Sequence, residues 1–417
     1  MLDINLLKNN LEEVKTGLEK RGDISGFDFE RILELDNKRR ELIAKSEELK
    51  AKRNKNSKIK PTPEIIAAMK NLGIEIKSLE EQLNKIDLEL TEKMSELPNI
   101  PAPDVVSGGK ENNEVIYTYG KQPEFSFTPK DHVELATDLG LIDYERAVKM
   151  SGSGFWCYTG SGALIEWALL SYFIDFHTNN GYNFLIPPFL LTERSAYISG
   201  HLPKFRDDLF WNQDKLCLNA TSEMMLGNYH REETLDVKEL PKKYFAYSPC
   251  FRREAGSYRQ EERGMIRGHQ FNKVEMFIFS KPEESWEMFA EMTANAKKLI
   301  EGLGLHFQVS KLAAGDCGAA MAKTYDIEVY IPSMKIYKEV SSVSNALDYQ
   351  ARRGQIKYKN EETGKNEFLH TLNGSGLATS RLLPAILEQN QQPDGSVLIP
   401  KVLRQYLPKK MKFLKKN

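Results

Sequence analysis

Apolar residues in the first hundred positions recur at alternating steps of four and three, a spacing typical of helices packed along a narrow seam. The clearer series consists of Leu72, Ile76, Leu79, Leu83, Ile86, Leu90 and Leu97. A weaker series consists of Ile32, Leu35, Leu42 and Leu49, with polar Arg39 and Ser46 between them. Pro61 and Pro63 separate the two series, and proline cannot continue a helix. The pattern predicts an antiparallel helical coiled-coil arm that turns within residues 54–63.

The pattern changes after a proline-rich connector at residues 97–103. Strand-like runs follow at residues 183–186, 244–251, 267–279, 325–331 and 337–342, and helical stretches at 163–177 and 283–302. The runs have the spacing of hairpins rather than regular strand–helix alternation, so we expect a mainly antiparallel sheet with helices around it. The predicted class is α+β, with an N-terminal domain at 1–103 and a second domain at 104–417.

The 58 basic and 59 acidic residues give a formal net charge of −1, which excludes a uniformly basic nucleic-acid binder. Basic residues nevertheless gather beside the predicted turn of the arm, with no acidic residue among them: Lys50, Lys52, Arg53, Lys55, Lys58 and Lys60. They form either a solvated helix end or an arm that binds the phosphates of a nucleic acid. Their place on a projecting hairpin favours the second interpretation.

The four cysteines, Cys157, Cys217, Cys250 and Cys317, lie far apart, which is typical of neither a zinc site nor a disulfide framework. No apolar run approaches the roughly 18–20 residues that a membrane span needs. The first residues show no signal-peptide pattern. We therefore expect a cytoplasmic protein that does not contact membranes.

Arg252 and Glu254 come at the end of the strand predicted at 244–251. An arginine there can neutralise a phosphate, and an acidic residue two positions on would share its strand face and accept from an exocyclic amine. Taken alone, the two residues are better explained as a structural cross-strand pair. No P-loop and no strand-linked Gly-x-Gly-x-x-Gly occurs, so neither motif explains nucleotide binding.

Two further segments join predicted strands and helices. Residues 373–383 read Asn-Gly-Ser-Gly-Leu-Ala-Thr-Ser-Arg-Leu-Leu, where glycines at a predicted strand-to-helix junction would let the backbone approach a ligand. Arg381 would lie one or two turns into that helix and reach a phosphate tail, although a tight connection is an alternative interpretation. Residues 181–188 join a long helix to a strand that ends in two prolines, which says little by itself.

Together these segments resemble motifs 1, 2 and 3 of the class II aminoacyl-tRNA synthetases. Finer stretches at 202–205, 220–223, 269–276, 323–329, 338–345 and 349–353 resemble the seryl-tRNA synthetases in particular. The resemblance covers essentially the whole chain, including the arm. It implies a class II antiparallel sheet flanked by helices, and an ATP-dependent ligase of protein biosynthesis. Such a ligase forms seryl-adenylate and transfers serine to tRNA(Ser), and to tRNA(Sec) where that tRNA exists.

The resemblance also implies roles for single residues. Those implied to bind ATP are Arg252, Arg253, Glu254, Arg267, Phe271, Glu339, Val340, Ser341, Ser342 and Arg381. Those implied to bind serine are Thr221, Ser222, Glu223, Glu275, Asn373 and Ser375. Arg252, Glu254 and Arg381 would be catalytic, and they would meet the α-phosphate, the adenine amino group and the γ-phosphate respectively. Glu339 and Ser342 would place Mg²⁺ against ATP.

The family further implies a homodimer formed through residues 181–188, and an arm that embraces the long variable arm of tRNA(Ser). The loop at 255–264 would meet the acceptor end, but its residues 258–263 depart from the usual small stretch and leave those contacts open. Two alternatives are a non-catalytic RNA- or protein-binding paralogue and an amino acid:carrier-protein ligase. The intact arginines argue against the first, and the arm argues against the second.

Overall fold

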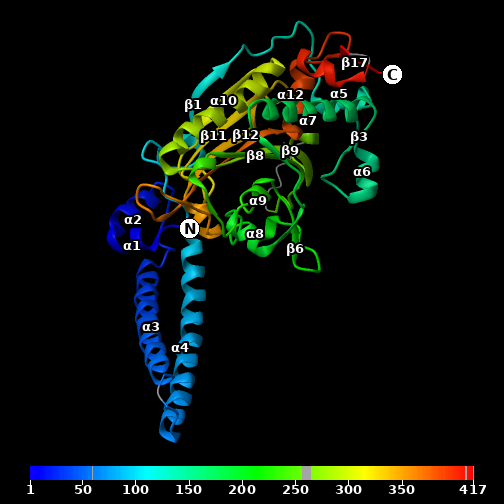
Figure 1. Ribbon diagram of the computed structural model, residues 1–417. Helices are drawn as coiled ribbons and strands as arrows, with labels where there is room; N and C mark the ends of the chain where they lie inside the picture. The colour runs from blue at the N-terminus through cyan, green and yellow to red at the C-terminus, as the bar shows by residue number, and fades with distance from the viewer. Residues whose placement is uncertain (59, 256–263, 409–410, 417) are drawn as a thin grey trace. The chain divides into compact units, whose positions relative to one another are not determined.

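The computed structural model describes residues 1–58, 60–255, 264–408 and 411–416, which divide into two units, Met1–Ile100 and Pro101–Asn417 (Figure 1). The sequence boundary at residue 103 falls slightly later than this division. The difference has a local cause, because the Ala102 amide donates to the Ala322 carbonyl at 2.8 Å. The end of the connector is thereby bonded to the second unit.

The first unit is helical and consists of α1 (Ile4–Asn9), α2 (Leu11–Glu19), α3 (Phe29–Asn56) and α4 (Pro63–Glu96). Three predicted seam residues, Leu35, Leu42 and Ile86, are buried together, and half-buried leucines of α4 pack against them. Helix α4 begins with proline in its first turn, where no intrahelical donor is lost, and the Thr62 hydroxyl caps it. The prolines that separate the two apolar series therefore also start the second helix.

Ion pairs across the arm show that its two helices run in opposite directions. Arg31 pairs with Glu89 at 2.8 Å, and Lys50 pairs with Glu80 at 2.8 Å. The partners run in opposite orders along α3 and α4, so the two helices are antiparallel (Figure 1). Arg39, a polar interruption of the weaker series, pairs with Asp87 of α4 at 2.5 Å. The predicted helical arm is confirmed.

The second unit is built on an eight-stranded sheet in the order β1-β10-β11-β12-β15-β9-β8-β4. In that order the strands are Glu114–Tyr119, Phe307–Lys311, Lys323–Ile331, Ile336–Leu347, His370–Ala378, Gln270–Ser280, Lys242–Phe251 and Asn183–Leu185. Neighbouring strands are antiparallel except β4, which is parallel to β8. The predicted α+β class with a mainly antiparallel sheet is confirmed.

Helices α7 (Ser161–Asn179), α10 (Ser285–Leu303) and α12 (Thr379–Gln389) pack against this sheet, and α5 (His132–Asp138) packs against α12 (Figure 1). Their apolar faces share one core with the inward side chains of the strands, including the fully buried Phe173, Phe245 and Phe307. Helix α12 starts at the residue after β15 ends. The end of the central strand β15 and the first turn of α12 are consequently held in fixed positions.

The smaller elements connect these layers. The helices are α6 (Tyr144–Ser151), α8 (Glu193–Ile198), α9 (Glu223–Leu226) and α11 (Tyr349–Gly354). The strands are β2 (Ile142–Asp143), β3 (Cys157–Tyr158), β5 (Leu190–Thr192), β6 (Leu216–Leu218), β7 (Thr234–Leu235), β13 (Lys357–Lys359), β14 (Asn366–Phe368), β16 (Val397–Leu398) and β17 (Phe413–Leu414). The 3₁₀ turns are η1 (Lys110–Asn112), η2 (Arg206–Asp208), η3 (Val237–Glu239), η4 (Gly264–Ile266), η5 (Pro282–Glu284) and η6 (Lys401–Tyr406). Within the described ranges, no helix is both long and apolar enough to cross a membrane.

Two differences from the predicted strands have simple causes. The run predicted at 267–279 becomes a strand only at Gln270, because the preceding residues follow the η4 turn. Strand β1 lacks a prediction because it is an edge strand whose residues are almost all exposed. An edge strand of this kind carries no apolar alternation that a sequence pattern would reveal.

Candidate active site

Arg252 and Glu254 lie just beyond the last residue of β8, where the chain leaves the sheet. The Arg252 amide still donates to the His269 carbonyl at 2.9 Å, but Glu254 has a φ of 51°, in the left-handed region. The expectation that strand alternation puts both side chains on one face is therefore wrong. The two residues nevertheless line one hollow, because the turn brings Glu254 back beside Arg252.

We call this cavity the arginine hollow; it is lined by Arg252, Glu254, Arg267, Phe271, Val340, Glu339 and Arg381, among others. The Arg252 guanidinium lies over the Phe271 ring, 5.3 Å from its centroid. Arg267 pairs with Glu254, and Arg381 donates to the backbone carbonyl of Glu339 at 2.9 Å. Three guanidinium groups thus face one cavity, an arrangement suited to a polyphosphate.

Arg381 lies in the first turn of α12, earlier in the helix than predicted. Its position is fixed from two sides, because Nε donates to the Ile266 carbonyl at 3.2 Å and Nη1 lies 3.3 Å from the Glu339 carboxylate. Two backbone carbonyls and a carboxylate therefore hold the guanidinium in the wall of the arginine hollow.

Gly374 and Gly376 lie inside β15 and not at its junction with the helix. A Cβ at Gly374 would come within 2.8 Å of the Met292 sulfur, and one at Gly376 within 2.2 Å of His177 Nε2. These glycines therefore make room for α10 and α7, which is a different requirement for glycine from the close approach to a ligand that the sequence predicts. His177 contacts the Gly376 carbonyl at 2.7 Å, and burial lowers the pKa of His177 to about 4.

A second cavity of about 350 Å³, the polar hollow, shares Arg252, Lys273, Glu339 and Ser375 with the first. It is also lined by Thr221, Glu223, Glu275, Asp326, Ser342 and Asn373. Five of the six residues predicted to bind serine, all but Ser222, therefore meet in one place. They come from α9 and its approach, from β9 and from β15, which are far apart in the sequence.

Lys273 and Glu275 form a buried ion pair at 2.6 Å in the floor of the polar hollow. Lys273 also donates to the Thr221 hydroxyl at 2.6 Å, and the Ser375 hydroxyl donates to Glu275 at 3.2 Å. The sequence prediction omits Lys273. The signal for it was the alternation of Phe271, Lys273 and Glu275 along β9, which puts all three on one face.

Glu223 opens the short helix α9 and is buried. Burial, and then the nearby charge of Glu275, raise the pKa of Glu223 to about 7, against the opposing effects of Gln350, Lys273 and Arg252. A carboxyl group with this pKa changes its charge near neutral pH.

Three predicted site residues line neither hollow. The Ser222 hydroxyl is fully buried and hydrogen-bonds to the Ser248 hydroxyl at 2.7 Å. The Ser341 hydroxyl donates to the carbonyl of Ser375 at 2.6 Å, so it bonds to a residue of the cavity wall without lining the cavity itself. Arg253 is exposed. The loop residues 256–263, which include most of the predicted acceptor-end loop, lie outside the described residues.

Glu339 and Ser342 of β12 line the polar hollow opposite Asp326 of β11, which the sequence prediction omits. Asp326 Oδ1 is buried without a hydrogen-bond partner among the described residues, and burial and Glu339 raise the pKa of Asp326 well above its usual value. Two carboxylates and a hydroxyl suit Mg²⁺, which binds one or two carboxylates together with substrate phosphates. Among the described residues, this site included, no cluster of three or more His, Cys, Asp or Glu side chains is placed to hold a metal.

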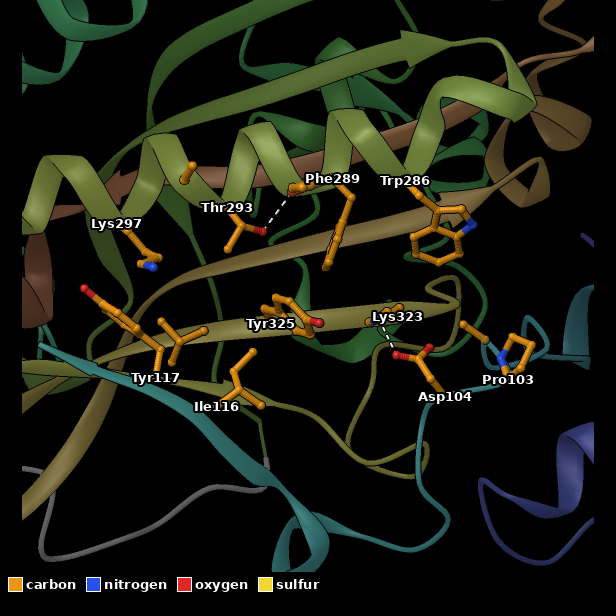
Figure 2. A pocket seen from close by; sticks show the side chains of 14 residues that line it. Pro103, Asp104, Ile116, Tyr117, Trp286, Phe289, Thr293, Lys297, Lys323 and Tyr325 are labelled. Carbon is orange, nitrogen blue, oxygen red and sulfur yellow. Dashed lines mark hydrogen bonds and ion pairs between the residues drawn. The ribbon is translucent and has the colours of Figure 1, made fainter.

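A larger groove of about 780 Å³ lies between α10 and the β1–β10–β11 edge of the sheet (Figure 2). Its walls include Trp286 and Phe289, and its lysine Lys323 is paired with Asp104 at 2.5 Å (Figure 2). It lacks the converging arginines and the buried carboxylates of the other two cavities. Chemistry rather than size therefore identifies the arginine and polar hollows as the candidate active site.

Comparisons with known proteins agree with this geometry. The model of the seryl-tRNA synthetase N-terminal domain matches residues 1–101, and that of the class II core domain of the G, H, P, S and T synthetases matches residues 205–390. Serine--tRNA ligase 2 of Clostridium acetobutylicum is 52% identical, over 98% of this chain and 99% of that protein. The chain belongs to the seryl-tRNA synthetase family. The resemblance inferred from the motifs is confirmed, and the chain is an aminoacyl-tRNA ligase.

Other members of the seryl-tRNA synthetase family extend the match. The serine--tRNA ligase of Geobacter sulfurreducens is 45% identical over 98% of each chain. The crystal structure of seryl-tRNA synthetase from Pyrococcus horikoshii, complexed with ATP, has a TM-score of 0.91 and 34% identity, and the match covers 100% of both chains. The similarity therefore includes the arm as well as the catalytic unit.

Proposed function

We propose that this synthetase activates L-serine with ATP to form seryl-adenylate and then transfers serine to tRNA(Ser). The observation that carries the proposal is the junction of the two hollows at Arg252. On one side lie guanidinium groups suited to phosphates, and on the other lies a small buried pocket of hydroxyl and carboxylate groups. A substrate that spans this junction has an anionic end beside Arg252 and a polar end in the pocket.

In the first step, the carboxylate of serine attacks the α-phosphorus of ATP and pyrophosphate leaves. Both reactants are negatively charged, so Arg252 would lower their repulsion and hold the reacting oxygens in line. Phe271 would stack on the adenine, Glu254 would accept from its amino group, and Arg267 and Arg381 would hold the phosphate tail. In the second step, the 3′-terminal hydroxyl of the tRNA attacks the acyl carbonyl and AMP leaves.

The polar hollow supports serine as the amino acid. Glu223 and Thr221 would receive its ammonium group, while Glu275, Asn373 and Ser375 would surround its hydroxyl. Alanine would leave those buried groups unpaired, a mismatch that costs about 10⁴–10⁵ in specificity. Threonine differs by a methyl group and must be excluded by shape, which discriminates only about 10–200-fold.

Mg²⁺ would be held by Glu339 and Ser342, with Asp326 beside them. When bound, it would neutralise and orient the phosphates of ATP. The unpartnered Asp326 oxygen and the crowding of the two carboxylates support a cation at this position.

Exposed apolar side chains support the predicted homodimer. Trp167 on α7 is 58% exposed, and Ile186, just after β4, is 75% exposed. Trp167 lies on the helix that leads into residues 181–188, and Ile186 lies within that segment, so a self-complementary contact through this helix–strand unit would cover exposed apolar surface. We infer that the dimer acts in the cytoplasm, where protein biosynthesis uses its product.

An ATP–pyrophosphate exchange assay with serine, threonine, alanine and glycine tests the proposed activity. We expect exchange with serine, and values of kcat/KM at least about 10³-fold lower with alanine and glycine. The value of kcat/KM for threonine should lie between that for serine and those for alanine and glycine. Absence of serine-dependent exchange, or equal exchange with alanine, would overturn the proposal.

The basic tip of the arm supports tRNA binding. Lys50 and Lys52 are paired with Glu80 and Glu48, whereas Lys55, Lys58 and Lys60 carry no ion pair among the described residues. We propose that these three lysines contact tRNA phosphates, on tRNA(Ser) and, where it is present, on tRNA(Sec).

Replacing Lys55, Lys58 and Lys60 together with glutamine should lower kcat/KM for tRNA(Ser) by roughly ten- to a hundredfold at low salt and weaken its salt dependence. Serine-dependent exchange should not change, because that reaction does not use the arm. The same replacements at the exposed Lys335, Lys359 and Lys365 provide the control. Equal loss in both triple variants would contradict the assignment, and charging of a tRNA(Sec) transcript tests the second substrate.

A further inference from the structure

Helix α11 carries buried polar side chains that the proposed chemistry does not use. Gln350 is 1% exposed, and all the strong hydrogen-bonding groups of its amide have partners. Nε2 donates to Glu223 Oε1 at 2.7 Å and to the Ser199 carbonyl at 2.9 Å, and Oε1 accepts from the Thr371 hydroxyl at 2.7 Å. Because both ends of the amide are bonded, its orientation is determined.

These bonds leave the Glu223 carboxylate with one oxygen held and one available. Oε1 is held by Gln350, and Oε2 has no hydrogen-bond partner among the described residues. Glu223 lines the polar hollow, whereas Gln350 does not. A long carboxylate side chain that is held at one oxygen has fewer rotamers to lose when a cation meets the other.

Gln350 is itself firmly anchored, because α11 is bonded to the backbone at the end of α8 and just after it. Arg353 Nη1 donates to the carbonyls of Tyr197 and Leu202, at 2.7 and 2.8 Å. With the bond from Gln350 to Ser199, α11 binds three carbonyls of residues 197–202. Thr371 completes the anchor from β15, two positions before Asn373. The amide therefore joins α9, the segment after α8 and the central strand.

We propose that Gln350 is a positioning residue for serine: it holds Glu223 so that the free carboxylate oxygen receives the ammonium group of the substrate. Gln350 acts through Glu223 and touches neither serine nor ATP. This inference rests on the proposed function, since it presupposes that Glu223 meets the amino group of serine.

The hydrogen bond also has a consequence for pH. The charged groups that face Glu223 are Glu275 and Lys273 of β9 and Arg252 after β8. His201 lines the same hollow and stays neutral, since burial and the neighbouring cations lower its pKa to about 3. The bond from Gln350 favours ionised Glu223, so its loss raises the pKa of Glu223 further above its usual range. Serine binding requires the ionised form and would weaken at neutral pH.

The test compares Gln350→Met and Thr371→Val with the wild-type enzyme in serine-dependent exchange. Gln350→Met keeps the side-chain volume but removes both the amide donor and the amide acceptor, so KM for serine should rise about tenfold or more while KM for ATP stays within about twofold. Thr371→Val removes only the bond that orients the amide and should raise KM for serine by about threefold. Gln391→Met is the control, because Gln391 is also a buried amide, its Nε2 bonds only backbone carbonyls, and it lines neither hollow.

The pH profile separates positioning from general destabilisation. In the wild type, kcat/KM for serine should rise with pH through about 7 and then level off. In Gln350→Met this acidic limb should move to higher pH, and in Gln391→Met it should stay. Equal increases in both KM values, or an unmoved limb in Gln350→Met, would overturn the inference. If Gln350→Met does not fold, Thr371→Val decides by the same two criteria. If the wild type shows serine-dependent exchange and the Gln350 and Thr371 variants behave like it, only the positioning role of Gln350 is refuted. If the wild type itself shows no serine-dependent exchange, the proposed function is refuted.

Discussion

Replacing Arg252 with methionine is expected to lower kcat/KM for serine-dependent exchange by about a thousandfold or more. Arg252 lines both hollows, lies over Phe271 and donates from Nε to the Ala220 carbonyl at 3.3 Å, so its guanidinium is held at their junction. Negative charge on the oxygens around the α-phosphorus is redistributed as the carboxylate attacks, and a fixed cation stabilises that transition state. Both kcat and kcat/KM should therefore fall.

Arg252→Lys distinguishes charge from geometry. Lysine restores a positive charge but lacks the planar fork that holds two oxygens at once, so we expect recovery of only part of the activity. The control is Arg206→Met, which removes an exposed arginine paired with Glu193 and should leave exchange within about twofold of the wild type. An Arg252→Met enzyme within tenfold of the wild type would contradict the assigned role.

Removing one member of the Lys273–Glu275 pair is expected to destabilise the catalytic unit by about 3–5 kcal/mol. The side chains are only 7% and 1% exposed, so Glu275→Gln leaves a buried ammonium uncompensated and Lys273→Met leaves a buried carboxylate uncompensated. Glu275→Gln should also raise KM for serine steeply, because the hydroxyl of the substrate loses its charged acceptor. Its discrimination against alanine should weaken for the same reason.

The double variant Lys273→Met/Glu275→Gln separates the effect on stability from the effect on serine binding. It removes both charges of the pair together, so it should recover most of the lost stability while serine activation stays impaired. Urea unfolding of the four proteins gives the coupling free energy of the pair, and exchange with serine and alanine gives the functional effect. Additive losses of stability would contradict a coupled buried pair. Recovery of serine activation in the double variant would contradict the role of Glu275.

The arm could be predicted in detail because its signals are local. A seam of leucines and isoleucines and two prolines suffice to define two helices and the turn between them, since helix periodicity and proline sterics act within a few residues. The sheet was predictable in class but not in order. Strand β15 pairs with β9 although β10 to β14 come between them in the sequence, and no alternation pattern specifies which strands pair.

The candidate site shows the same division at the level of single residues. The resemblance to the seryl-tRNA synthetases implied roles for Arg252, Glu275 and Arg381, and the structure places all three in the walls of the two hollows. Alternation along β9 also contained the signal for Lys273, although only the structure shows that it meets Thr221. The expectation that Arg252 and Glu254 share a strand face was wrong. Glu254 lies beyond the strand in a left-handed conformation, which ends the alternation of side chains.

By itself, then, the sequence determined the helical arm, the antiparallel α+β class and the kinds of side chain available for adenylate chemistry. Only the tertiary structure decided which of them meet. In the folded protein, Ser222 and Ser341 line neither hollow, and Asp326 lies opposite Ser342. Gly374 and Gly376 leave the space in which α10 and α7 pack. The tertiary structure also placed Gln350 behind Glu223. The physical reason is that local patterns determine the face on which a side chain lies, whereas its partners depend on long-range strand order and packing.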